Sequence, residues 1–487
     1  MATRQSAPKD RWVELDSAAG EELVLSQVAQ AHVDETEVAL RAIHESFVRE
    51  QELGLRVLGK RWRAWTVSHQ QSETIEKTIA LAERARRDFR AFLLLGIGGS
   101  DLAPRVIHDC LDDPCHELLD SSQRGCGLEA HFGGDTFDPR SLAAIRRALA
   151  DRGLLADTLL NVVSRSGETS ETMAATAVIG EWLRQAGVAD WRQHAVATTR
   201  YRKSSLLYQM RRSFYGLLPV PAGVGGRFSL ASPVGLFTLA MTADEGLLPP
   251  RQRVHRALEG FEQGHRQCFD FSPTHQRSAA FRLARWLHLA ERHTGKTSLV
   301  FYNYADDRFL GDWVSQLYTE SIQERGQGLN VIGTRGPTGN HSLLNGIIRG
   351  PRDKLVVFVH WRELEPDIEV PANSHLGGGL AALKRLPLAH IQEASYRATA
   401  EEFTANGIPN VTLTVPRRDE RGLFQLMRIL MDTVAVKGRL QQLQITPSGT
   451  VDYPGELTYH QDGVEGYKTR VRAALREMRK RPRTSGQ

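Results

Sequence analysis

A glutamate in a helical pattern and an arginine in a glycine-rich turn are the residues of this chain best suited to proton-transfer chemistry. Glu320 ends the segment that begins at Trp313, and Gln316 precedes it by one helical turn on the same face. Arg227 directly follows Gly226. A carboxylate can move a proton between atoms, and a guanidinium is a permanent cation that can stabilise a developing oxyanion. Taken singly, such a glutamate is ordinarily a solvated charge, and such an arginine is an ordinary surface residue.

Two turns have the composition of phosphate-binding loops. The run 96–100 reads Gly-Ile-Gly-Gly-Ser, and the run 164–169 reads Ser-Arg-Ser-Gly-Glu-Thr. Glycines let main-chain N–H groups approach an anion closely, and hydroxyls at a helix start can hold a phosphate. Each turn alone could equally be an ordinary strand-to-helix connection with a capping hydroxyl. The candidate phosphate contacts are Gly99, Ser100, Ser164, Arg165, Ser166, Gly167 and Thr169.

Neither turn matches a nucleotide-binding motif. Asp101 occupies the place of the third glycine in a dinucleotide fingerprint, and no Gly-Lys-Ser/Thr follows to make a P-loop. A dehydrogenase is therefore disfavoured.

Two more titratable residues lie in short polar segments. His341 stands in Asn-His-Ser after a Gly/Pro-rich loop, and an imidazole exchanges protons near neutral pH. Lys468 ends the segment that starts at Gln461 and reads Gln-Asp-Gly-Val-Glu-Gly-Tyr-Lys. By itself, Lys468 is an unremarkable lysine on an amphipathic helix.

The elements that must position these residues alternate between strand and helix. Short apolar runs end in turns and are followed by amphipathic helices, which is typical of a doubly wound parallel sheet. We predict strands at 91–95, 159–163, 194–198, 214–220, 298–302, 330–332, 354–359 and 411–415. We predict helices at 21–31, 35–52, 421–443 and 464–478, and a helical stretch at 250–292.

This rhythm occurs twice, so the fold class is α/β, with two doubly wound parallel-sheet domains in tandem. We expect a helical N-terminal arm at 1–75, a first domain with the phosphate-binding loops at 76–250, a second domain at 251–445, and a C-terminal arm with a helix at 446–487.

Composition narrows the class of protein. The chain has 487 residues, 41% hydrophobic and 24% charged, as expected of a soluble globular protein. It has no apolar run of the ~18 residues that a membrane span needs, and no secretory signal. The net charge of +5 is mild, and its one dense basic run, 476–483, is more typical of a solvated helix end than of a nucleic-acid-binding arm. We expect a cytoplasmic protein with neither nucleic acid nor membrane as partner.

A cluster of histidines and cysteines raises the question of a metal. Thiolate and imidazole are the usual zinc ligands, but the spacing here matches no standard zinc knuckle, and the four cysteines of the chain form no CxxC pair. We therefore expect no metal site. The cluster comprises His108, Cys110, Cys115, His116 and Cys126.

Several of these segments together resemble one family. The run 164–169 is similar to the phosphosugar-binding loop of SIS (sugar isomerase) domains, Ser-x-Ser-Gly-x-Thr. The run 225–229, Gly-Gly-Arg-Phe-Ser, matches the signature GGR[FY]S of the phosphoglucose isomerase family. The segments around Glu320, His341 and Lys468 resemble that family's motifs and occur in its order, over roughly residues 85–475.

The resemblance implies an aldose–ketose isomerase with two SIS domains and no cofactor. It would interconvert glucose 6-phosphate and fructose 6-phosphate through an enediol(ate). Glu320 would shuttle the proton, Arg227 would hold the enediolate, and His341 and Lys468 would assist ring opening. Gly226 and Gln316 would line the pocket, and Gln461 would contact the phosphate. In the family the histidine reaches the active site of the other subunit, which implies a homodimer.

Some positions depart from the family pattern and keep alternatives open. Arg165 replaces the usual lysine, Glu324 stands in the pair that replaces Gly-Lys, and Asp462 replaces a proline. The alternatives are an isomerase of another hexose phosphate and a non-catalytic SIS regulator that binds sugar phosphates. The regulator would need the phosphate loops but not the four catalytic candidates together.

Overall fold

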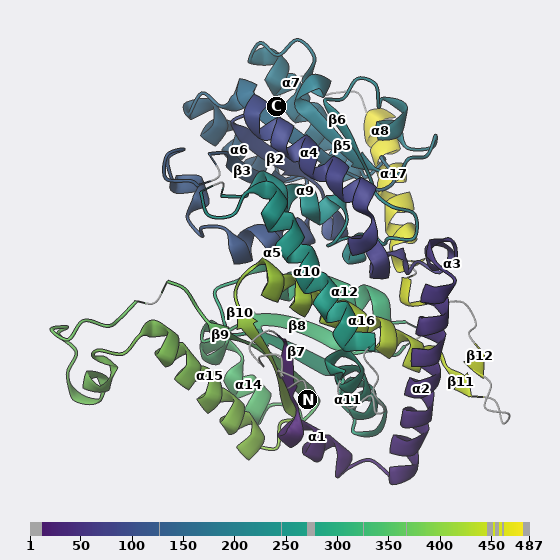
Figure 1. Ribbon diagram of the computed structural model, residues 1–487, viewed down its shortest axis with the longest axis vertical. Coiled ribbons are helices and arrows are strands. Elements are labelled where there is room, and N and C mark those ends of the chain that lie inside the picture. The colour runs from purple at the N-terminus through teal and green to yellow at the C-terminus, as the bar shows by residue number, and fades with distance from the viewer. Residues whose placement is uncertain are drawn as a thin grey trace, which may run out of the picture.

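The computed structural model describes residues 12–125, 127–244, 246–269, 278–324, 326–366, 368–445, 451–452, 457–459 and 462–480. Within them, two five-stranded sheets are covered by helices (Figure 1). Every strand pair in the two sheets is parallel, apart from one short strand at an edge. The predicted α/β class is confirmed.

The first sheet is entirely parallel and has the spatial order β3-β2-β4-β5-β6. The next strand after β2 in the chain, β3, lies on one side of it, and β4 lies on the other. The carboxyl ends of β2 and β4 therefore form the switch point at which such sheets bind ligands. The strands are β2 (Ala91–Leu95), β3 (Glu129–Gly133), β4 (Thr158–Val163), β5 (Ala195–Thr199) and β6 (Gly216–Pro219).

The second sheet has the order β1-β10-β9-β7-β8. Its edge strand β1 comes from the N-terminal segment and pairs antiparallel with β10. The strands are β1 (Glu14–Asp16), β7 (Ser298–Asn303), β8 (Asn330–Arg335), β9 (Lys354–Glu363) and β10 (Asn410–Arg417). A separate two-stranded ribbon consists of β11 (Gln444–Ile445) and β12 (Val451–Asp452).

Helices fill the space around and between the sheets. The longest buried one, α16 (Glu420–Gln442), packs against α10, α11 and α12. The others are α1 (Ala18–Leu25), α2 (Gln30–Glu52), α3 (Leu55–Lys60), α4 (Ser72–Asp88), α5 (Leu102–Leu111), α6 (Pro139–Asp151), α7 (Ser170–Gln185), α8 (Leu206–Gln209), α9 (Pro233–Met241), α10 (Pro250–Phe269), α11 (Ala279–His293), α12 (Phe309–Ile322), α13 (Thr338–Ser342), α14 (Leu344–Arg349), α15 (Leu388–Ala405) and α17 (Glu465–Lys480).

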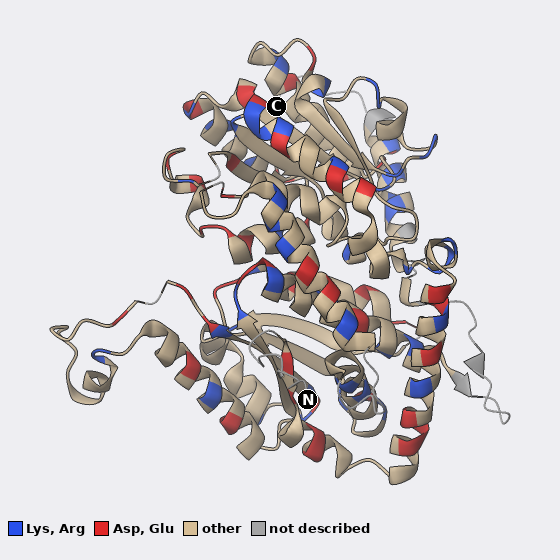
Figure 2. Ribbon diagram, viewed as in Figure 1, with Lys and Arg blue, Asp and Glu red and all other residues tan. Residues whose placement is uncertain are grey.

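The surface helices carry both signs of charge. Figure 2 shows acidic and basic residues interspersed along α2 and α10. None of the helices in the described residues is both long and apolar enough to cross a membrane.

Most predicted elements are present, with differences at the N-terminus and in one strand. The break between the first two helices falls at 26–29, so the predicted helix at 21–31 is wrong at these four residues. The predicted helical stretch 250–292 contains two helices, α10 and α11. Strand β1 was not predicted, because three residues are too few to show a pattern. The boundaries proposed for the domains stay predictions.

Strand β3 was also missed, because polar residues interrupt it. Glu129 and His131 are buried in β3. The Glu129 carboxylate accepts hydrogen bonds from Arg124 and Arg152 and contacts His131. These contacts satisfy a buried charge that a hydrophobic pattern alone would place at the surface.

Candidate active site

Arg227 lies buried at the junction of three chain segments. It belongs to the short 3-10 helix Gly226–Phe228 and is only 2% exposed. Its Nε donates to Ser321 Oγ at 2.7 Å, and its Nη1 donates to Glu320 Oε2 at 2.9 Å. Its Nη2 donates to the main-chain oxygens of Glu320 at 3.0 Å and Thr458 at 2.7 Å. Burial lowers the pKa of Arg227, and the charge of Glu320 acts against that shift.

Glu320 presents a carboxylate that is held at both oxygens. Oε2 accepts from Arg227, and Oε1 accepts from Gln316 Nε2 at 3.0 Å, from one turn earlier on α12. The side chain is 29% exposed. The carboxylate therefore has a fixed orientation and still faces solvent, as a group that must reach a substrate proton requires.

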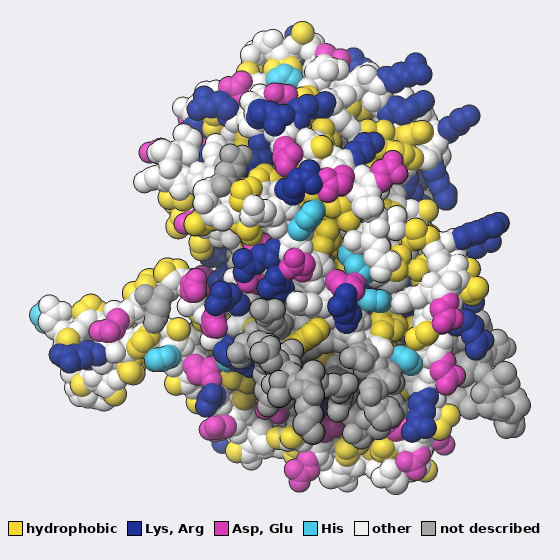
Figure 3. All heavy atoms as spheres, viewed as in Figure 1, with side chains coloured by type: hydrophobic (Ala, Val, Ile, Leu, Met, Phe, Trp, Pro, Cys, Tyr) yellow, Lys and Arg dark blue, Asp and Glu magenta, His cyan; other side chains and the backbone are white. Residues whose placement is uncertain are grey.

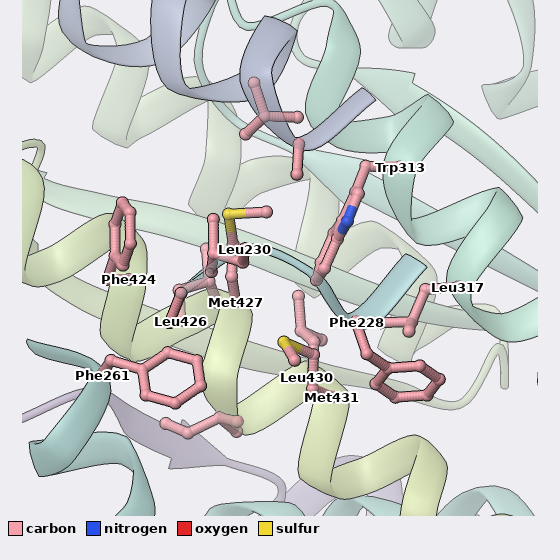
Figure 4. Packing of buried hydrophobic residues seen from close by; sticks show 14 of the residues in the cluster. Phe228, Leu230, Phe261, Trp313, Leu317, Phe424, Leu426, Met427, Leu430 and Met431 are labelled. Carbon is pink, nitrogen blue, oxygen red and sulfur yellow. The ribbon is translucent and has the colours of Figure 1, made fainter. Parts of the chain in front are cut away.

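Packing on the adjacent face of α12 fixes the position of this pair. Trp313 and Leu317 are buried one turn apart, whereas Gln316 and Glu320 form the polar stripe of the same helix. Figure 4 shows Trp313 and Leu317 beside Phe228, with Met431 of α16 nearby. Phe228, which follows Arg227, is thus part of the hydrophobic core that also holds α12, the helix of Glu320.

The first phosphate-type turn lies directly against this group. A Cβ added to Gly99 would lie 2.2 Å from the carbonyl carbon of Gly226 and 2.3 Å from the nitrogen of Arg227. Ser229 Oγ donates to the Gly99 oxygen at 3.1 Å. The two main chains can approach this closely only because position 99 is glycine. Ser100, at the end of the turn, is half-buried.

The second turn follows β4 and is held together by its own hydroxyls. Ser164 Oγ lies 2.8 Å from Thr169 Oγ1 and accepts from the nitrogen of Gly167 at 3.0 Å. Ser166 Oγ accepts from the nitrogen of Glu168 at 3.2 Å, and the Ser166 side chain is exposed. Gly167 has φ +72°, a conformation that favours glycine.

Arg165 connects this turn to Glu320 electrostatically. Burial lowers the pKa of Arg165, and the negative charge of Glu320 acts in the opposite direction. Since β2 and β4 are neighbours in the sheet, both turns lie at the switch point, and α12 of the second sheet brings the carboxylate to them.

His341 lies at the other end of the second sheet. It is exposed on α13, which follows the carboxyl end of β8. Glu320, by contrast, is near the end of α12, where Gln323 Nε2 donates to the oxygen of Leu329 at 2.8 Å, beside the start of β8. Among the described residues, no hydrogen bond joins His341 to Arg227 or Glu320.

Of the two C-terminal candidates, Lys468 and Gln461, the structure describes only Lys468. Lys468 is exposed on α17, which runs beside the part of the molecule that holds the first sheet (Figure 1). Gln461 lies outside the described residues.

The cluster of histidines and cysteines makes contacts within the protein. His108 Nδ1 lies 2.7 Å from Asp112 Oδ2, and His116 Nε2 lies 3.1 Å from the oxygen of Leu128. Cys110 is buried and Cys115 exposed, both as free thiols, and Cys126 lies outside the described residues. Within the described residues, no three His, Cys, Asp or Glu side chains are grouped closely enough to hold a metal ion.

Two residues that hold Arg227 were not among the sequence candidates. Ser321 follows Glu320 in the chain, and its position in the motif could have indicated it. Thr458 contributes a main-chain oxygen, and nothing in its side-chain type signals such a role.

Comparison with known proteins shows extended sequence similarity. The family described as Phosphoglucose isomerase matches residues 36–246. A glucose-6-phosphate isomerase of Rubrobacter xylanophilus is 33% identical over 401 residues, covering 81% of this chain and 88% of that protein. One of Carboxydothermus hydrogenoformans is 28% identical over 418 residues, covering 84% of this chain and 86% of that protein.

Solved structures share the fold. A hypothetical protein of Thermus thermophilus superposes with a TM-score of 0.76 at 27% identity, covering 95% of this chain and 99% of that one. A glucose-6-phosphate isomerase of Chlamydia trachomatis gives a TM-score of 0.68 at 19% identity, covering 92% of this chain and 79% of that one.

Proposed function

The chain belongs to the phosphoglucose isomerase family, and with that family as the premise we propose how its site works. The protein is an aldose–ketose isomerase that interconverts glucose 6-phosphate and fructose 6-phosphate. The observation that carries the proposed mechanism is the Glu320 carboxylate, held by Arg227 and Gln316 next to the glycine turn that ends at Ser100.

Glu320 is the base that moves a proton between C1 and C2 of the open-chain sugar. Its fixed orientation means that little reorganisation is needed when the substrate carbons arrive. Arg227 is the permanent cation beside it, so the enediolate oxygen that develops during the reaction meets a positive charge already in place.

The phosphate of the substrate binds at the switch point of the first sheet. Its oxygens would accept hydrogen bonds from the turn 164–169 and from the N–H groups of the turn 96–100. This anchor fixes the distance from the phosphate to the reacting carbons, so that binding energy positions C1 and C2 over Glu320. Lys468 and Gln461 are proposed as a ring-opening group and a phosphate contact, respectively.

We propose a homodimer in which His341 serves the site of the other copy. Within one chain, α12 separates His341 from Glu320, because the eleven residue steps from Phe309 to Glu320 span ~16 Å of helix. A second copy could bring its own exposed histidine to the site without any rearrangement of the fold.

A projecting segment, residues 364–366 and 368–387, offers surface for such a contact. Figure 3 shows it extending from the body of the molecule with hydrophobic side chains on its surface. Ile368 is 56% exposed and Leu380 57% exposed, so this segment presents two large apolar side chains to solvent. The occupant we propose is the second copy of the chain. A cytoplasmic location fits the free thiols of Cys110, Cys115 and Cys268.

The experiment that tests the function is a coupled assay of the purified protein. With chelator present, it should convert fructose 6-phosphate to glucose 6-phosphate. Mannose 6-phosphate and other hexose phosphates in the same assay would reveal a different or additional substrate. Binding of fructose 6-phosphate without turnover would instead identify a non-catalytic regulator.

A further inference from the structure

Two arginines at the edge of the first sheet share one tryptophan. The guanidinium carbon of Arg165 lies 5.0 Å from the centre of the Trp62 ring, and that of Arg200 lies 4.9 Å from it. Arg165 follows β4, and Arg200 follows the neighbouring strand β5. The Arg200 nitrogen also donates to the Arg165 oxygen at 3.4 Å. Both side chains therefore lie at the carboxyl edge of the sheet, beside the turn 164–169.

The charge of Glu320 acts on Arg165, but no carboxylate in the described residues forms an ion pair with either arginine. Among the described residues, no salt bridge includes Arg165 or Arg200, and the Nε of Arg200 is buried without a hydrogen bond. Burial, followed by the positive charges of Arg165 and Arg202, lowers the pKa of Arg200 to about 10. Two like charges in a half-buried place are unfavourable unless an anion joins them.

Trp62 is fixed in place by the N-terminal segment. Its φ of +60° is uncommon for a residue with a side chain, so the surrounding structure must hold it there. The next residue, Arg63, is fully buried, and its Nε lies 3.0 Å from Glu50 Oε2 on α2. The Arg63 nitrogen donates to the oxygen of Leu58 at 2.8 Å. These contacts beside Trp62 anchor the ring that both arginines contact.

We propose that Arg200 is a further phosphate-binding residue and that Trp62 is a positioning residue, which holds the guanidinium groups of Arg165 and Arg200 toward the phosphate of the substrate. The ligand class, a sugar phosphate, rests on the proposed function. A planar guanidinium can stack on an aromatic ring and still direct several N–H groups at phosphate oxygens, which a lysine ammonium cannot do. The arginine in place of lysine at position 165 fits this arrangement.

The test compares five proteins in two measurements. Arg200→Gln, Trp62→Leu and Trp62→Phe are measured beside the unmodified protein and Arg211→Gln. Arg211 is an exposed arginine whose guanidinium carbon lies 4.6 Å from the ring of Tyr208, so it matches Arg200 in type and stacking but lies outside the site. Calorimetry gives the affinity for inorganic phosphate, and the coupled assay gives KM and kcat for fructose 6-phosphate.

We expect Arg200→Gln to weaken phosphate binding by roughly tenfold or more and to raise KM similarly, because a hydrogen bond to a charged group is lost. Its kcat should change little, since the reacting carbons contact other residues. Trp62→Leu should weaken phosphate binding in the same direction, Trp62→Phe should restore most of it, and Arg211→Gln should bind phosphate normally.

Normal phosphate affinity in Arg200→Gln would overturn the assignment of Arg200. A loss of thermal stability in Trp62→Leu with unchanged phosphate affinity would show that the ring only packs the N-terminal segment. If the unmodified protein bound phosphate but turned over no hexose phosphate, the proposed function would fail. The calorimetric comparison would still decide the role of Arg200.

Discussion

At the scale of single residues, hydrogen bonds from Arg227 and Gln316 fix the orientation of the Glu320 carboxylate. Arg227 directs donors to Ser321, Glu320 and Thr458, so the guanidinium cannot rotate away from the carboxylate. Gln316 occupies the other carboxylate oxygen. The proposed role of Glu320 as the base can be tested with a substitution that removes its negative charge and keeps its shape.

Glu320→Gln should lower kcat by roughly 10²–10⁴-fold, because the side-chain amide cannot accept the proton. Binding of fructose 6-phosphate should stay within a few-fold of normal, since the amide oxygen still accepts from Arg227. The coupled assay and calorimetry measure the two quantities. Glu181→Gln, an exposed change on α7, serves as the control and should leave both unchanged. Normal turnover by Glu320→Gln would rule out its role as the base.

At the scale of elements, the decisive contact is between two turns that are far apart in the sequence. The turn after β2 touches the turn that carries Arg227 through Gly99 and Gly226, with no side chain between them. The sheet edge proposed to bind phosphate and the arginine proposed to stabilise the oxyanion are thereby held close together.

Gly99→Ala should disturb this contact, because its Cβ would overlap main-chain atoms that cannot move cheaply. We expect a loss of ~1–3 kcal/mol of stability, as for overpacked sites, together with a marked fall in kcat. Gly346→Ala, on the exposed surface of α14, is the matched control, since no atom lies within 4 Å of its added Cβ. Thermal unfolding and the coupled assay measure both effects. Equal melting temperatures and rates for the two variants would contradict the close approach.

At the scale of the whole molecule, buried ion pairs join the halves that contain the two sheets. Arg253 of α10 lies 2.7 Å from Asp112, after α5, and 3.0 Å from Glu420 at the start of α16. Burial opposes the ionisation of Asp112, but the charges of Arg253 and His108 outweigh it and lower the pKa of Asp112. The candidate site depends on these ion pairs, because each half of the molecule supplies some of its residues.

Asp112→Ala should destabilise the protein by ~3–5 kcal/mol, because it leaves the buried Arg253 without its nearest charge partner. Glu76→Ala breaks the exposed pair between Glu76 and Arg251, which also joins α4 to α10, and should cost much less stability because solvent screens this pair. Denaturant unfolding compares the two variants. A similar small loss for both would show that the buried pair does not hold the halves together.

The sequence by itself determined the fold class and the main strands, and it supplied Glu320 and Arg227 as candidates for the catalytic pair. The fully apolar run 91–95 is short and is followed by a glycine-rich turn, which favours a buried strand, and motif spacing indicated Glu320 and Arg227. These signals are local, since they depend on residues within a few positions of one another.

Only the tertiary structure decided which distant residues meet. It placed β1 at the edge of the second sheet. It put His341, on α13, at the other end of the second sheet from Glu320. It also brought Trp62 into contact with Arg165 and Arg200. None of these long-range contacts can be recognised from the hydrophobic periodicity of the sequence. They arise because buried surface and buried charge must be satisfied by whichever segments the packed sheets bring together.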